Sequence, residues 1–531
     1  MLFPLPPLAE QKRIVAAIEK NAAIVRKTWR IKMFEYELEP TFDNIYKIII
    51  SDPIKRNEFL FTFYDLLNSI SSATTISLDG SWGSGKTFFI KQTELLLKSE
   101  LPEIEEIKND KSRNVEYQRF ELINEKIKEH KLNRDMQSIP QLPIYYDAWK
   151  NDNATDPILS LIYEIVKAFH NMYKFKGKPE VLNALKGIAK SIVSSIDLNI
   201  NLTKKTITPE SNLPLAENNN DTQQQGVNIN VSGEKLATLF DNFDKFKAPD
   251  LLEDFKKEDN LHELINQFFD KLSLDNKTRL VIFIDELDRC KPTYAIQFLE
   301  RIKHYFDRQN ITFVFSTNIK ELINTVQNYY GNNFNGSRYL DKFFDLRLQL
   351  PKVELFYYLK LLKVEERYGF KIDFLKQVFD YFNLEMREIT RFLKIFELST
   401  NNMFGKVFTG EYEEHAMQMC KEYILPFLIS VYITNIKLFE EIITGKAEKE
   451  FVDFYMSDLN SLFFRTYNFS NQKVMCQEIY HQLFNNKSHI GPENIQISEN
   501  LAQYKLKFNT EHKKQLLASL SLLSTFTDYR N

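Results

Sequence analysis

A glycine-rich octapeptide in the first fifth of the chain has the composition of a phosphate-binding loop. It matches G-x-x-x-x-G-K-[ST] in full, and its residues are Gly80, Ser81, Trp82, Gly83, Ser84, Gly85, Lys86 and Thr87. Glycines let backbone N–H groups turn toward phosphate oxygens, and the N-terminus of the following helix adds positive potential. The Lys86 ammonium would reach the β- and γ-phosphates, and the Thr87 hydroxyl would be a ligand of Mg²⁺. A glycine-rich turn without a ligand is the alternative, and the complete motif makes it the weaker one.

Two acidic residues, Asp285 and Glu286, follow an apolar run that begins at Thr278. Ligands of open α/β folds bind at the carboxyl ends of the strands, so a strand ending here would hold both carboxylates beside the phosphates. Asp285 is expected to hold hydrated Mg²⁺, and Glu286 to orient and deprotonate the attacking water. An acid followed by Glu favours ATP hydrolysis over kinase or GTPase chemistry. A strand that ends in acids by chance is the alternative, which the phosphate loop upstream makes weaker.

Other residues near these acids have less specific interpretations. Asn318 follows the apolar run Ile311–Thr317, where an amide could polarise the lytic water. Asn is also a preferred N-cap, so a capping role is almost equally open. Asp288 and Arg289 could act in catalysis or form an ion pair or a contact with a neighbour. Cys290 is expected to be a packed residue, and the histidines show no metal-binding spacing.

The elements that must position these residues are indicated by the apolar runs. Five runs predict strands, and they are Thr74–Asp79, Pro143–Trp149, Thr278–Asp285, Ile311–Thr317 and Asp345–Leu350. Most are continuously apolar and are separated by helical patterns, which indicates a parallel sheet covered on both faces. After Pro351 only helical patterns follow. The predicted fold class is α/β, with a parallel-sheet P-loop NTPase core and a helical C-terminal domain.

Changes of composition divide the chain into five parts. We expect an amphipathic helix in residues 1–40. The two parts of the core are expected in residues 41–175 and 234–351, and the helical C-terminal domain in residues 352–531. Residues 176–233 are a polar insertion with the spacing of one helix and a long-looped β-hairpin. Its stretch ENNNDTQQQ has almost nothing to bury, so part of the insertion is expected to be disordered.

The charge balance argues against a protein held to nucleic acid by a global positive field. Lys and Arg number 69 and Asp and Glu 72, so the formal net charge is −3 and any nucleic-acid contact must be local. Three cysteines form no CxxC pair, which fits a reducing compartment and predicts a cytoplasmic protein. Neither a secretion signal nor a transmembrane segment is expected, because the N-terminal residues lack the pattern of a signal peptide and no apolar stretch is long enough to span a bilayer.

Four strings of residues, together with the phosphate loop, resemble the KAP family of P-loop NTPases. They are YYDAWKND, IDELDRCKP, SRYLDKFFDLRLQLP and MREITRFLK, in order between about Asp52 and Lys394. The resemblance implies an ATPase core of the additional-strand type with a helical lid, ATP and Mg²⁺ as ligands, and a relation to signalling NTPases and to anti-phage defence in bacteria. Many family members carry transmembrane helices between the phosphate loop and the acidic strand. Here that stretch is polar, so membrane anchoring is not expected.

Three arginines are candidates for neutralising charge on the γ-phosphate. Arg387 and Arg391 are spaced i, i+4 in the lid region, where the resemblance places a second sensor. Arg387 is expected to sense nucleotide within the subunit, and Arg391 to be a packing or ion-pair residue. Arg338 follows the loop GNNFNGS on the core and is the weaker candidate, for action across a subunit interface.

The start of the chain has a second resemblance. Its string PLPPLAEQKRIVAAIE, residues 4–19, is similar to a helix of type I restriction specificity subunits, and any amphipathic entry helix is the alternative.

Together these features predict a cytoplasmic ATPase whose nucleotide cycle changes the arrangement of core and lid. A defence system is its expected setting, with a homo-oligomer or another protein as partner. One alternative is a nucleotide-gated scaffold that binds ATP tightly and hydrolyses it barely. The other is a DNA-handling motor, which only the restriction-like start suggests and which the charge balance opposes.

Overall fold

The structure is a computed structural model in which the described residues fall into two units. The described residues are 39–101, 114–130, 140–153, 156–173, 186–189, 258–272, 279–305, 310–368, 372–402, 410–457, 472–484, 501 and 505–521. The core unit comprises residues 40–353, and the helical unit contains residues 354–531. The predicted N-terminal helix, the β-hairpin and the ENNNDTQQQ stretch lie outside the described residues.

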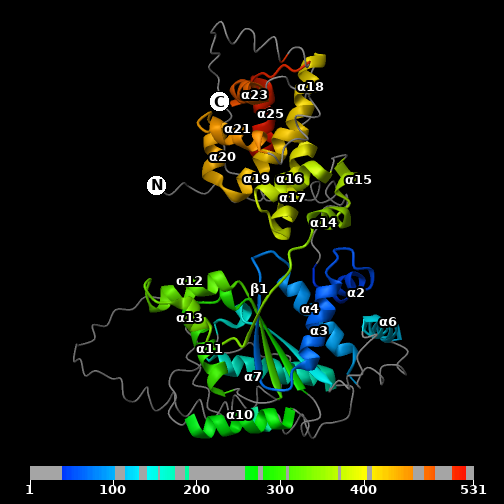
Figure 1. Ribbon diagram of the computed structural model, residues 1–531, viewed down its shortest axis with the longest axis vertical. Helices are drawn as coiled ribbons and strands as arrows, with labels where there is room; N and C mark the ends of the chain where they lie inside the picture. The colour runs from blue at the N-terminus through cyan, green and yellow to red at the C-terminus, as the bar shows by residue number, and fades with distance from the viewer. Residues whose placement is uncertain are drawn as a thin grey trace, which may run out of the picture. The chain divides into compact units, whose positions relative to one another are not determined.

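A five-stranded parallel sheet forms the centre of the core unit (Figure 1). Its strands follow the order β2-β3-β4-β1-β5. The strands are β1 (Thr74–Asp79), β2 (Gln141–Asp147), β3 (Arg279–Asp285), β4 (Ile311–Thr317) and β5 (Leu346–Gln349). β4 separates the strand that leads into the phosphate loop from the strand that ends in Asp285. This order is that of the additional-strand P-loop ATPases, so the predicted fold class is confirmed.

Helices cover both faces of this sheet, which explains why its central strands are apolar throughout. Every residue of β3 and β4 is buried. Successive side chains of β3 pack into the hydrophobic cores on opposite faces of the sheet, Ile282 into one and Val281 into the other. One face is covered by α7 (Pro157–Tyr173), α10 (Glu258–Leu272), α11 (Pro292–Tyr305), α12 (Ile319–Tyr330) and α13 (Gly336–Leu340). The other is covered by α2 (Phe42–Ser51), α3 (Asn57–Ser69), α4 (Lys86–Ser99) and α6 (Asn114–His130).

The second strand ends earlier than its apolar run predicts. β2 stops at Asp147, and Trp149 begins the short 3₁₀ helix η1 (Trp149–Asn151). The Asp147 carboxylate accepts a hydrogen bond from the backbone N–H of Lys150 at 2.9 Å, and the Asn151 amide donates to the Asp147 carbonyl at 2.8 Å. The prediction that Trp149 belongs to the strand is wrong, because these local hydrogen bonds favour a turn over a continued ladder.

In the helical unit the described secondary structure is helical throughout. Its helices are α14 (Leu355–Leu361), α15 (Val364–Tyr368), α16 (Ile372–Tyr381), α17 (Met386–Asn402), α18 (Glu411–Met419), the π-helix η4 (Cys420–Ile424), α19 (Leu425–Thr434), α20 (Ile436–Ile443), α21 (Glu448–Met456), α23 (Gln472–Phe484) and α25 (Thr510–Ser521). Among the described residues of the whole chain, no helix combines the length and the apolar character needed to cross a bilayer.

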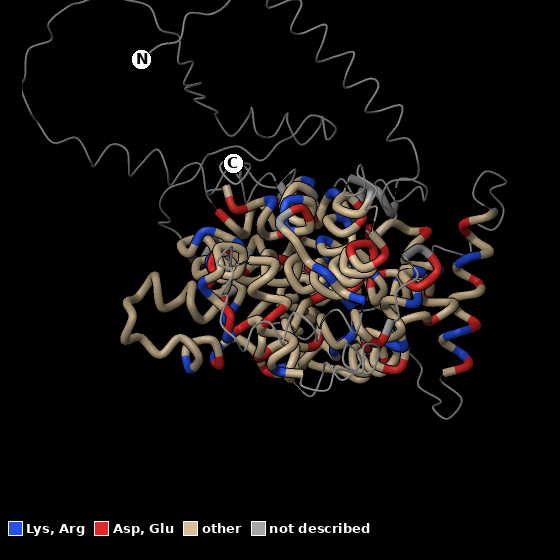
Figure 2. Tube along the Cα trace, turned by 90° about the horizontal axis from the view of Figure 1, so that it is seen from above, with Lys and Arg blue, Asp and Glu red and all other residues tan. Residues whose placement is uncertain are grey.

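Charged residues of both signs are interspersed along the trace of the chain (Figure 2). This mixture agrees with the formal net charge of −3. A field of one sign over a whole face would need the two colours to separate.

Candidate functional site

The phosphate loop connects the end of β1 to the start of α4, and its glycines have distinct roles. Gly83 and Gly85 have φ angles of 87° and 86°, a left-handed conformation in which other residues are strained. Gly80 is needed for space instead, since a Cβ there would lie 2.8 Å from the Ser84 hydroxyl oxygen. Gly85 is the N-cap of α4, so the helix begins at Lys86 and points its N-terminus into the loop.

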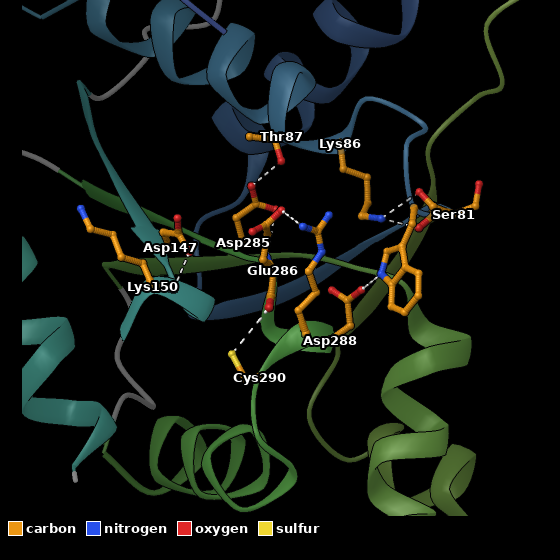
Figure 3. Close-up of polar contacts among 12 residues, drawn as sticks. Ser81, Lys86, Thr87, Asp147, Lys150, Asp285, Glu286, Asp288 and Cys290 are labelled. Carbon is orange, nitrogen blue, oxygen red and sulfur yellow. Dashed lines mark hydrogen bonds and ion pairs between the residues drawn. The ribbon is translucent and has the colours of Figure 1, made fainter. Parts of the chain in front are cut away.

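The Lys86 side chain is folded back onto the loop that carries it. Its ammonium donates to the carbonyl oxygen of Gly80 and, at 3.1 Å, to that of Ser81 (Figure 3). Burial lowers the pKa of Lys86, while the nearby carboxylates of Asp288 and Asp285 act in the opposite direction. The ammonium is thus held beside the loop by two carbonyl oxygens that a phosphate could replace.

Thr87 and Asp285 come together from elements far apart in the sequence. The Thr87 hydroxyl donates to Asp285 Oδ2 at 2.7 Å, and the Asp285 residue is 1% exposed (Figure 3). Burial raises the pKa of Asp285, and the hydrogen bond from Thr87 partly offsets that rise. The two residues expected to bind Mg²⁺ are therefore neighbours at the carboxyl edge of the sheet.

Tyr145 is a residue of this site that the sequence interpretation missed. Its hydroxyl donates to the same Asp285 oxygen at 3.1 Å, and the Lys91 ammonium lies 3.2 Å from the centre of its ring. Burial and the Asp285 carboxylate raise the pKa of Tyr145, which keeps its hydroxyl a donor. The pairing of β2 with β3 was the available signal, because Tyr145 lies opposite Phe283, two residues before the acid.

Glu286 stands at the turn after β3 and forms an ion pair with Arg289. Its backbone is left-handed, with φ of 60°, and one of its carboxylate oxygens lies 2.7 Å from Arg289 Nη1 (Figure 3). The neighbouring Asp288 accepts a hydrogen bond from the indole N–H of Trp82 in the phosphate loop. Of the two interpretations of Asp288 and Arg289, the structure thus shows the ion pair and the neighbour contact.

Comparison with known proteins relates this geometry to a family. A family model described as the KAP family P-loop domain matches residues 56–403. The chain belongs to the KAP family. An uncharacterized protein from Methanocaldococcus jannaschii is 29% identical over 174 residues, a match that covers 30% of this chain and 82% of that protein. Among solved structures, the Aeropyrum pernix ORC2 protein in ADPNP–ADP complexes is 12% identical, with a TM-score of 0.27 over 85% of this chain and 93% of that chain.

The KAP match begins at residue 56, downstream of the restriction-like string. The resemblance of residues 4–19 to a restriction specificity subunit therefore stays a prediction.

Asn318 caps a helix at the edge of the KAP core. It follows β4, and its side-chain oxygen accepts a hydrogen bond from the backbone N–H of Glu321 at 3.4 Å. The backbone N–H of Ile319, the first residue of α12, donates to the Asp79 carboxylate at 2.9 Å. The capping interpretation is what the geometry shows, and a role of Asn318 toward water stays a prediction.

The three candidate arginines lie in two different units. Arg338 is exposed on α13 in the core unit, and its backbone N–H is capped by Asn335. Arg387 and Arg391 are on α17 in the helical unit, where the Arg391 guanidinium lies 5.9 Å from the centre of the Tyr432 ring. That contact agrees with a packing role for Arg391, and the sensor role of Arg387 stays a prediction.

Cys290 is buried beside the site without the features of a nucleophile. Its thiol contacts the Glu286 carbonyl oxygen at 3.6 Å, and burial raises its pKa. The thiolate form, which is the nucleophile, is therefore disfavoured.

The residues at the site fit a bound Mg²⁺ ion. Within the described part of the chain no group of three or more His, Cys, Asp or Glu side chains could hold a metal. Mg²⁺ in phosphate sites takes one or two protein oxygens and completes its shell with water and phosphate. The buried Asp285 carboxylate and the Thr87 hydroxyl, 2.7 Å apart, match that donor set.

Proposed function

We propose that this KAP protein is an ATPase that binds Mg²⁺ and ATP at residues 80–87 and hydrolyses ATP with Glu286 as general base. The observation that supports this best is the 2.7 Å contact between Thr87 and Asp285, which joins the end of the phosphate loop to the acidic strand. A phosphate loop alone is compatible with many reactions. An acid followed by Glu at the end of β3, which β4 separates from β1, favours hydrolysis.

In this proposal each residue of the site has a separate task. The backbone N–H groups of the loop and the N-terminus of α4 bind the phosphates. Lys86 exchanges the carbonyl oxygens of Gly80 and Ser81 for phosphate oxygens. Glu286 takes the proton of the attacking water. Mg²⁺, when bound by Thr87 and Asp285, would neutralise charge on the β- and γ-phosphate oxygens.

Steady-state hydrolysis tests the proposal directly. We expect phosphate release from ATP that requires Mg²⁺ and is lost in Asp285→Asn, which keeps the shape of the side chain and removes its charge. Arg347→Ala is a suitable control, since Arg347 pairs with Asp341 at 2.7 Å outside the site. Magnesium-independent release, or release that survives in Asp285→Asn, would contradict the assigned site.

A nucleotide-gated scaffold is the second candidate, and one observation favours it. The proposed general base is paired with Arg289 at 2.7 Å, which would lower resting turnover. Such a protein would show a stable ATP-bound assembly with little more than one turnover. Comparing a single-turnover rate with the lifetime of any assembly separates the two candidates.

For the wider role, we propose a cytoplasmic defence or signalling protein that acts as a homo-oligomer or with a protein partner. The support is the KAP membership together with the mixed charge, which offers no general nucleic-acid surface. ATP hydrolysis measured with and without added nucleic acid tests the partner class.

A further inference from the structure

The turn after β3 fixes the side chain of Glu286 in a short-range ion pair. Glu286 precedes the 3₁₀ helix η3 (Leu287–Arg289), and Arg289 ends it. The two residues thus stand three apart at the two ends of one short turn, and their side chains meet there. The pair is 2.7 Å long, and the side chains of Arg289 and Glu286 are 22% and 18% exposed, so the pair is partly in contact with solvent.

Two tryptophans from other segments contact this turn. The Arg289 guanidinium lies 5.4 Å from the centre of the Trp149 ring, and Trp82 donates its indole N–H to Asp288. Trp149 belongs to η1 after β2, and Trp82 to the phosphate loop. A guanidinium over an indole face gains an attraction that a lone ion pair lacks. The position of Arg289 is therefore set from two directions, by Glu286 and by Trp149.

We propose that Arg289 is a positioning residue that restrains Glu286, so that the ion pair must open before the carboxylate can accept a proton from water. While the pair is closed, the Glu286 oxygen that contacts Arg289 is not available to a water molecule. The inference rests on the proposed function, because it takes Glu286 as the general base. Arg338 and Arg387 are expected to promote turnover, whereas Arg289 lowers it.

The size of the effect follows from the exposure of the pair. Ion pairs in contact with solvent are weak, so this one opens spontaneously. Turnover then proceeds only during the fraction of time in which the pair is open. Removing the arginine should raise kcat by about two- to fivefold, the range that the strength of such a pair allows. The KM for ATP should change less than about twofold, because the phosphate loop is untouched.

Four variants of the full chain test the restraint. Arg289→Gln and Arg289→Ala remove the charge in two ways, so a folding defect in one leaves the other. Arg289→Lys keeps a cation and should stay closest to the wild type. The matched control is Arg347→Ala, which also breaks an ion pair, with Asp341, and a contact with an aromatic ring, that of Phe344. Circular dichroism and nucleotide binding confirm that each variant is folded.

The results distinguish the restraint from the ATPase activity itself. A higher kcat in Arg289→Gln and Arg289→Ala, with an unchanged control and no turnover when Glu286→Gln is added, supports the restraint. Turnover that needs Glu286 but is equal or lower in both Arg289 variants overturns the restraint alone. Absence of Mg²⁺-dependent turnover in the wild type and in every variant overturns the proposed function and the restraint together.

Discussion

At the scale of single residues, Lys86 and Glu286 have tasks that can be separated by mutation. Lys86→Ala removes a charged donor to the phosphates and should weaken ATP binding by roughly tenfold or more. Glu286→Gln keeps the phosphate loop intact and should leave binding unchanged while kcat falls by at least about a hundredfold, since general bases contribute that much. Nucleotide titration and steady-state hydrolysis measure the two effects. Wild-type turnover in Glu286→Gln would show that the water-activating role is wrong.

The cysteines give a second test at this scale. Burial raises the pKa of Cys476 to about 12 and also raises the pKa of Cys290 and Cys420, so almost no thiolate exists at neutral pH. The native protein should react slowly with a thiol reagent at pH 7, and all three thiols should react promptly after denaturation. A thiol that reacts at once in the native state would contradict the described burial. Cys290→Ala should retain ATP hydrolysis.

At the scale of elements, the junction of β4 and α12 combines a cap with a possible donor. The cap uses the side-chain oxygen of Asn318, whereas a contact to water would use the amide nitrogen of the same group. Asn318→Asp keeps the oxygen and loses the N–H groups, so we expect unchanged thermal stability and a kcat lower by roughly tenfold, the worth of one hydrogen bond. Asn318→Ala should also lose about 1 kcal/mol of stability.

Thermal denaturation and hydrolysis of the two Asn318 variants decide between the interpretations. Full activity in Asn318→Asp would leave the residue with the capping role alone. Reduced stability in Asn318→Asp would instead mean that the charge disturbs the junction, where Asp79 already accepts from Ile319.

The elements also show what the sequence predicted and what it could not. The strands were predictable because buried parallel strands such as β3 and β4 are apolar without interruption. The meeting of Thr87 and Asp285 followed from their places at one sheet edge. The end of β2 was missed because it depends on hydrogen bonds of two side chains, those of Asp147 and Asn151. Contacts such as Tyr145 with Asp285 depend on rotamers and strand register, which apolar patterns leave undetermined.

At the scale of the whole molecule, the charge distribution predicts how turnover responds to nucleic acid. Basic and acidic residues are interspersed along the described trace (Figure 2), and the net charge is −3. Non-specific binding to a duplex depends on clustered Lys and Arg that neutralise phosphates. We therefore expect duplex DNA to leave ATP hydrolysis unchanged at about 150 mM salt, near physiological ionic strength. Stimulation that weakens steeply as salt is raised would instead favour the DNA-handling motor.

The action of an arginine on the γ-phosphate also concerns the whole molecule, because the arginine can come from the same chain or from a neighbouring subunit. Arg387→Ala should lower kcat in every subunit that carries it, because the residue is expected to act within its own chain. Mixing Arg387→Ala protein with Lys86→Ala protein should therefore restore nothing. Activity restored by this mixture would show that Arg387 acts on a neighbouring subunit.

Arg338 is expected to behave in the opposite way, because it is exposed on α13 of the core unit, where it can face another chain. In a mixed assembly, a Lys86→Ala subunit cannot bind ATP well but still carries Arg338, and an Arg338→Ala subunit keeps an intact phosphate loop. If the arginine acts across the interface, the first subunit completes the site of the second, and the mixture regains hydrolysis that neither variant has alone. An Arg338→Ala protein that is fully active by itself removes this residue from the mechanism, since a missing charge at the γ-phosphate should cost most of the turnover.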